Sequence, residues 1–113
     1  MQEEGREYIT PEIEKRQHRR AKLVAQVQCE ALGRESIMVT RDVSVGGMFV
    51  SSENPFPQDC DVALSFRLRA GDPPLSCRGK IVYAIRGMGM GIEFAGLSEE
   101  ARQALQKFVD EAA

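Results

Sequence analysis

Two short clusters of residues in this sequence carry side chains that could bind one ligand together. The first is Arg16-Gln-His-Arg-Arg20, in which two arginines stand four positions apart. In an extended chain their Cα atoms would lie about 13 Å apart, so the pair could hold opposite ends of a small anion. Guanidinium is a planar fork that binds phosphate through two hydrogen bonds and stacks on aromatic faces. This cluster therefore predicts an anion site.

The second cluster is Asp42-Val-Ser-Val-Gly-Gly47. Adjacent glycines accept backbone angles that other residues resist, and they leave room for a ligand to approach the backbone. Asp42 and Ser44 point to the same side if the chain is extended there. A turn capped by its own side chain is an alternative interpretation, which is compatible with binding because a turn can preorganise a site.

An acidic side chain near a basic anion site is a useful combination if the ligand contains guanine. The Watson–Crick edge of guanine carries N–H donors that a carboxylate accepts, whereas its O6 and N7 accept from arginine or a hydroxyl. A ligand with both phosphates and guanines could therefore use the two clusters at once.

Short strands are the elements that must position these clusters. Leu23, Ala25, Val27 and Cys29 alternate with outward-facing partners, which is typical of a half-buried strand. Similar apolar or alternating runs, separated by turn signals, predict six strands near residues 23–30, 37–41, 48–50, 60–68, 77–85 and 90–94. Closing an antiparallel sheet removes its exposed edges, so six such strands favour a β-barrel.

After Gly96 the apolar period becomes that of a helix. Ser98 is a natural N-cap, and Glu99 and Glu100 suit the first turn of the helix. The predicted apolar face consists of Ala101, Ala104, Leu105, Phe108 and Val109. At the other end of the chain, residues 1–14 are acidic and lack a clean period, so we expect a flexible tail before a single domain at 15–113.

The order of these features resembles the PilZ domain family. Arg16-Gln-His-Arg-Arg20 is similar to the RxxxR motif before the first strand, and Asp42-Val-Ser-Val-Gly-Gly47 is similar to the DxSxxG motif. Gly79-Lys-Ile-Val-Tyr83, Gly89-Met-Gly-Ile-Glu-Phe94 and the closing helix also resemble the family, so the match covers roughly residues 14–110. The resemblance implies a six-stranded antiparallel barrel with a C-terminal helix and a flexible N-terminal segment. It also implies a bacterial receptor for the second messenger cyclic di-GMP.

The resemblance also implies which residues would bind the dinucleotide. The motif positions are Arg16, Arg20, Asp42, Ser44 and Gly47. Additional candidates are Lys15, Arg19, Gly46 and Tyr83, the last near a strand position that is often Trp in the family. The alternation of Tyr83 with Ile81 and Ile85 makes core packing an equal alternative for its ring.

Several other functions are disfavoured by composition. An acidic pI near 5.5 and two tyrosines without tryptophan argue against a nucleic-acid-binding barrel. No acid–base pair or nucleophile constellation indicates an enzyme. The one histidine, His18, and the cysteines do not have metal-ligand spacing, so we expect Cys29, Cys60 and Cys77 to be small core side chains without a metal or cofactor.

The chain also lacks an apolar run near the roughly 20 residues of a membrane span and a signal-peptide pattern at its start, so we expect a cytoplasmic protein. Two functions then remain. One is a receptor whose N-terminal segment rearranges on binding and offers a changed surface to a protein partner. The other is an adaptor that docks a partner without binding the nucleotide.

Overall fold

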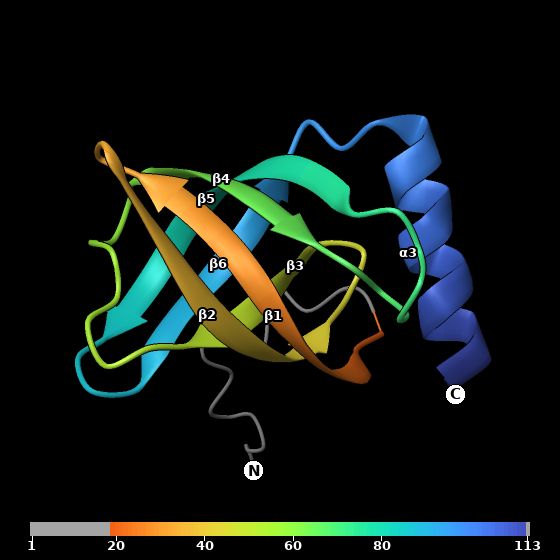
Figure 1. Ribbon diagram of the computed structural model, residues 1–113, viewed down its shortest axis with the longest axis horizontal. Helices are drawn as coiled ribbons and strands as arrows, with labels where there is room; N and C mark the ends of the chain where they lie inside the picture. The colour runs from red at the N-terminus through yellow and green to blue at the C-terminus, as the bar shows by residue number, and fades with distance from the viewer. Residues whose placement is uncertain (1–18, 113) are drawn as a thin grey trace, which may run out of the picture.

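Six strands close into an antiparallel barrel, and one helix packs against one end of it (Figure 1). The computed structural model describes residues 19–112. The order of strands around the barrel is β1-β2-β3-β6-β5-β4. The elements are β1 (Ala21–Ala31), β2 (Arg34–Val43), β3 (Gly47–Ser51), β4 (Asp61–Phe66), β5 (Leu75–Ile85), β6 (Gly89–Ala95) and α3 (Glu99–Ala112). The predicted fold is confirmed. The expected acidic tail, 1–14, lies outside the described residues.

The core lies inside the barrel because alternate side chains of each strand point inward. Val62, Leu64 and Phe66 are buried along β4, as their alternation predicts. On β2 the inward residues are Met38 and Thr40, while Ile37 is 67% exposed. Alternation therefore identifies the inward face correctly on β4. On β2, apolar residues occur on both faces.

The three cysteines lie in or beside this core, as predicted. Cys29 is fully buried, and burial raises the pKa of its thiol to about 12. Cys77 is half-buried on β5, and the same cause raises its pKa to about 11. Cys60 is also half-buried and packs against the core cluster. Thiols with raised pKa are poor nucleophiles at neutral pH, so Cys29 and Cys77 act as small apolar side chains here.

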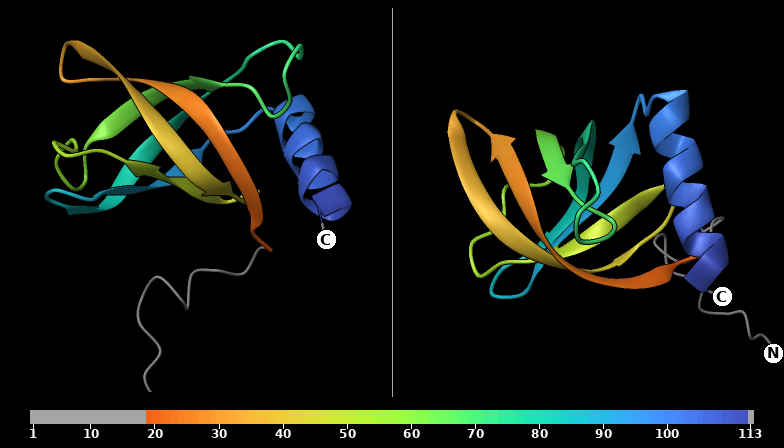
Figure 2. Two further views of the ribbon diagram at one scale, coloured as in Figure 1. Left: turned by 60° about the horizontal axis from the view of Figure 1, so that its bottom comes forward. Right: turned by 45° about the vertical axis from the view of Figure 1, so that its right-hand side comes forward.

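The helix α3 covers the end of the barrel where β1 begins (Figure 2). Ser98 caps it, since its Oγ accepts from the N–H of Ala101 at 3.0 Å. Leu105 is fully buried, whereas Ala104 is exposed, so the predicted apolar face was one residue too wide. No helix among residues 19–112 is long and apolar enough to span a membrane.

The loop between β3 and β4, residues 52–60, lies at the opposite end of the barrel (Figure 1). Phe56 in this loop is fully buried and belongs to the core cluster. The guanidinium of Arg34 lies 4.6 Å from the centre of its ring. The loop thus closes the end of the barrel that α3 leaves open.

Candidate ligand-binding site

The structure brings one arginine of the first motif to the acid of the second. Arg20 immediately precedes β1, and Lys22, two residues further on, pairs with Asp42 across the sheet. An Arg20 Nη2 hydrogen donates to Asp42 Oδ1 at 2.9 Å. The two side chains are 24% and 36% exposed, so the ion pair lies at the surface and within reach of a ligand.

A second hydrogen-bond donor of Arg20, its Nε–H, lacks an acceptor. The Nε atom is buried, and no acceptor among residues 19–112 forms a hydrogen bond with it. An unsatisfied buried donor costs roughly 1–3 kcal/mol. The guanidinium therefore has bonding capacity that Asp42 does not use.

Ser44 shapes the loop after β2 instead of facing outward. Its Oγ accepts from the backbone N–H groups of Gly46 and Gly47 at 3.0 and 3.1 Å, and the side chain is buried. The N–H of Ser44 in turn donates to the carbonyl of Gly47 at 2.8 Å. Asp42 and Ser44 would share one surface only in an extended chain, and the chain turns at Ser44 instead, which agrees with the alternative of a turn capped by its own side chain.

The glycines of this motif hold the loop against β6. A Cβ at Gly47 would lie 2.1 Å from the carbonyl oxygen of Ile92, which no side chain allows. The carbonyl of Gly46 accepts from the N–H of Phe94 at 2.8 Å. Gly47 therefore allows the close approach of β3 and β6, whatever it contributes to a ligand.

Tyr83 lies on the outer face of the barrel. A register shift between Ile81 and Tyr83 inserts Val82 as an extra residue and reverses the alternation, so Ile81 is buried while Ile85 is 43% exposed. The ring of Tyr83 stacks on Phe49 with centroids 6.3 Å apart. Core packing, the alternative for this ring, is wrong.

Phe49 is a candidate that the motifs did not single out. It stands between the buried Met48 and Val50, so alternation directs its ring outward. In the sheet it pairs with Asp42 on one side and Gly91 on the other, and Gly91 pairs with Tyr83. The outward phase of an aromatic residue, two positions after the motif, was the signal available in the sequence.

Two of the motif candidates cannot be placed. Lys15 and Arg16 lie outside the described residues, as does His18. Arg19 is exposed next to Arg20. Their proposed roles therefore stay predictions. Among residues 19–112 no cluster of three histidine, cysteine or acidic side chains could hold a metal ion.

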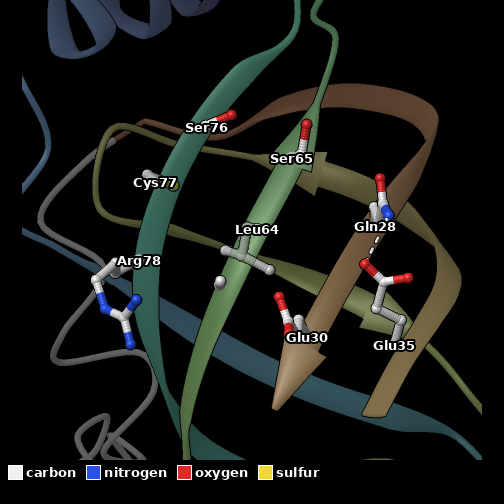
Figure 3. Close-up of a pocket in the computed structure, with 9 residues that line it drawn as sticks. Gln28, Glu30, Glu35, Leu64, Ser65, Ser76, Cys77 and Arg78 are labelled. Atoms are coloured by element: carbon white, nitrogen blue, oxygen red, sulfur yellow. Dashed lines mark hydrogen bonds between the residues drawn. The ribbon is translucent and has the colours of Figure 1, made fainter. Parts of the chain in front are cut away.

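An open groove of about 460 Å³ lies elsewhere on the barrel surface, across β1, β4 and β5 (Figure 3). Glu30, Ser65 and Arg78 line it, and Gln28 donates to Glu35 at 3.2 Å at its edge. None of the motif residues contributes to this groove. It is distinct from the surface around Arg20 and Asp42.

Comparison with known families agrees with this arrangement. Residues 14–111 match the model of the PilZ domain. The chain belongs to the PilZ domain family. Both motifs lie within the matched region, and the barrel places Arg20 of the first motif beside Asp42 of the second. No curated protein matched the chain in a sequence comparison.

Solved structures share the PilZ fold at low identity. The inhibitor of motility MotI/DgrA of Bacillus subtilis has 19% identity and a TM-score of 0.76, over 86% of this chain and 50% of its own. The PilZ domain of Escherichia coli YcgR with c-di-GMP has 12% identity and a TM-score of 0.70, over 87% of this chain and 91% of its own. Borreliella burgdorferi PlzA in complex with c-di-GMP has 19% identity and a TM-score of 0.60, over 74% of this chain and 32% of its own. The chain thus spans half of MotI/DgrA and about a third of PlzA.

Proposed function

We propose that this PilZ domain is a receptor for cyclic di-GMP. The observation that carries the proposal is the contact between Arg20 and Asp42, which joins the two motifs at one exposed place. The family match and the two solved neighbours that contain c-di-GMP support the identity of the ligand.

The chemistry of the pair suits a guanine nucleotide. The Asp42 carboxylate can accept from the N1–H and N2–H donors of a guanine, and the guanidinium of Arg20 can donate to a phosphate or to O6 and N7. An ion pair at this exposure is worth about 0–1 kcal/mol, so a ligand can replace it at little cost.

The remaining roles belong to the proposal as well. Arg16 and Lys15 would supply further phosphate contacts, and Ser44 and Gly47 would act by holding the loop that carries Asp42 in place. Ligand binding would rearrange the segment before β1 and change the surface that a protein partner meets. The proposal contains no catalytic step, and it assigns the protein to the bacterial cytoplasm.

Titration calorimetry with cyclic di-GMP tests the proposal directly. We expect a dissociation constant of roughly micromolar order, which corresponds to about −8 kcal/mol. Binding should weaken as salt is added, because contacts between phosphate and exposed arginine are screened. If millimolar ligand gives neither heat nor a shift in melting temperature, the receptor proposal is wrong and the adaptor function is favoured.

Cyclic di-AMP is the control ligand that tests selectivity for guanine. Adenine lacks the N1–H and N2–H donors, so it would leave the Asp42 carboxylate facing acceptors and should bind much more weakly. Equal affinity for the two dinucleotides would rule out the role assigned to Asp42.

A further inference from the structure

A second pocket on the outer face adjoins the contact between Arg20 and Asp42. It has a volume of about 630 Å³ and is lined by Arg41, Phe49, Ser51, Glu53 and Met88, among others. Volumes of about 300–1,000 Å³ are typical of small-molecule sites. Phe49 pairs with Asp42 across β2 and β3, so the edge of the pocket at Phe49 lies one strand spacing, about 4.8 Å, from the motif site.

An irregularity in β2 provides one wall of the pocket. The register between β2 and β3 shifts between Thr40 and Asp42, which leaves Arg41 as an extra residue on β2. Arg41 is exposed, and its Nε–H donates to Ser51 Oγ at 3.2 Å. This bond orients the planar guanidinium, and among residues 19–112 its terminal N–H groups donate to no other hydrogen-bond acceptor.

The opposite wall is tied together by backbone hydrogen bonds. The N–H of Ser52 donates to the carbonyl of Met88 at 2.9 Å, and the N–H of Gly87 donates to the carbonyl of Glu53 at 3.1 Å. These bonds join the start of the β3–β4 loop to the turn between β5 and β6. Glu53 and Met88 both line the pocket at this junction.

The ring of Phe49 is held in place from below and from the side. A Cβ at Gly89 would come within 2.8 Å of Phe49 Cζ, so the ring lies directly over the backbone of β6. The Tyr83 ring packs beside it, 6.3 Å away with an angle of 26° between the planes. A braced aromatic ring loses little conformational entropy when a planar ligand stacks on it.

The three functional groups of this pocket match the surfaces of a guanine. Phe49 offers a ring face for stacking, Arg41 offers N–H donors for O6 and N7, and Glu53 offers a carboxylate for N1–H and N2–H. Met88, which is 59% exposed, can cover the base edge with a flexible thioether. We infer that this pocket binds a guanine base, with Phe49, Arg41 and Glu53 as its recognition residues.

The inference rests on the proposed function for the identity of its ligand. The base belongs either to the same cyclic di-GMP molecule that contacts Asp42 or to a second molecule bound beside the first. Both sources present the same guanine chemistry to the pocket. Stoichiometry distinguishes them.

The test compares cyclic di-GMP binding to wild type, Phe49→Leu and Glu53→Gln by calorimetry. Loss of base stacking should weaken affinity roughly tenfold or more in Phe49→Leu if one molecule spans both sites. If two molecules bind, the stoichiometry should fall from two to one. Glu53→Gln should lose much of the preference for cyclic di-GMP over cyclic di-AMP. Ile37→Ala, at an exposed outer position of β2 that does not line the pocket, should bind as wild type does.

Guanosine monophosphate provides an independent readout, followed by the NMR signal of the Met88 methyl group. The signal should shift with guanosine but not adenosine monophosphate, and Phe49→Leu should abolish the shift. Unchanged cyclic di-GMP binding in both pocket variants would overturn the inference and leave the proposed function standing. If cyclic di-GMP does not bind but the guanosine shift depends on Phe49, the pocket stands and the proposed function fails. If wild type shows neither response, both are wrong.

Discussion

The loops on either side of β3 are stabilised in different ways. The β2–β3 loop (44–46) buries the hydroxyl of Ser44, which bonds to the loop's own backbone. The β3–β4 loop (52–60) buries the ring of Phe56, which fills the end of the barrel. The first loop satisfies its own backbone and leaves its neighbour Asp42 accessible at the surface, whereas Phe56 in the second loop contributes to stability through core burial. The two loops should therefore respond differently to substitution.

The largest loss of stability is expected for Phe56→Ala. Truncating a fully buried phenylalanine costs roughly 3–5 kcal/mol of unfolding free energy. This is a large share of the roughly 5–15 kcal/mol available to a domain. Urea denaturation would measure the loss. The folded fraction should keep the contacts of Arg20 and Asp42 with cyclic di-GMP, which lie away from this loop, so any loss of affinity would come from displacement of Glu53 at the start of the same loop.

Phe56→Leu serves as the control for this prediction. It keeps an apolar side chain in the same space, so it should recover most of the lost stability. An unfolding free energy of Phe56→Ala within 1 kcal/mol of wild type, roughly a surface effect, would show that the loop does not seal the core.

Gly47→Ala is expected to rank second. The new Cβ would meet the carbonyl oxygen of Ile92 at 2.1 Å, so β3 and β6 must move apart. Overpacking of this kind costs roughly 1–3 kcal/mol. Gly33→Ala is a useful comparison, since no atom would contact its Cβ within 4 Å and only its φ of +76° opposes the change. If Gly47→Ala has the same melting temperature as wild type, the glycine has no packing role and its role in the motif is ligand binding alone.

Ser44→Ala should have a smaller effect on stability. It removes the acceptor for the N–H groups of Gly46 and Gly47, and the loss of such a cap costs about 1–2 kcal/mol. Affinity for cyclic di-GMP should fall as well, because the loop no longer fixes Asp42. Ser44→Thr, which keeps the hydroxyl, should restore part of both. If Ser44→Ala lowers affinity without any change in stability, the hydroxyl acts on the ligand directly.

Periodicity predicted the strands and the helix because regular elements repeat their contacts with the core. It could not identify Phe56, since a loop residue has no period and its burial depends on how the barrel ends. The register shift before Tyr83 was equally hidden, because one extra residue in β5 reverses the face of all that follow. Alternation holds only while the pairing stays regular.

The chemistry of the site was more accessible to sequence reasoning than its geometry. Residue types alone suggested that Arg20 and Asp42 serve one ligand, and the structure places them 2.9 Å apart. The sequence left two conformations open at Ser44, an extended chain and a turn capped by its own side chain, and the structure has the turn. The pocket around Phe49 and Arg41 depends on a bulge in β2 that no motif records.

Arg20→Ala is expected to have the smallest effect on stability and a large effect on binding. The ion pair with Asp42 is exposed enough that its loss should cost at most about 1 kcal/mol of unfolding free energy. Charge-assisted hydrogen bonds to a ligand contribute roughly 1.5–3 kcal/mol each, so affinity for cyclic di-GMP should fall about tenfold to a hundredfold.

Arg102→Ala is the matched control, because it removes another exposed arginine–carboxylate pair, with Glu99 on α3, and should leave affinity unchanged. For both variants, the melting temperature measures the effect on stability and calorimetry measures the effect on affinity for cyclic di-GMP. If Arg20→Ala melts far below wild type, the segment before β1 is a structural part of the barrel. Weaker binding would then report damage to the fold instead of a lost contact with the ligand.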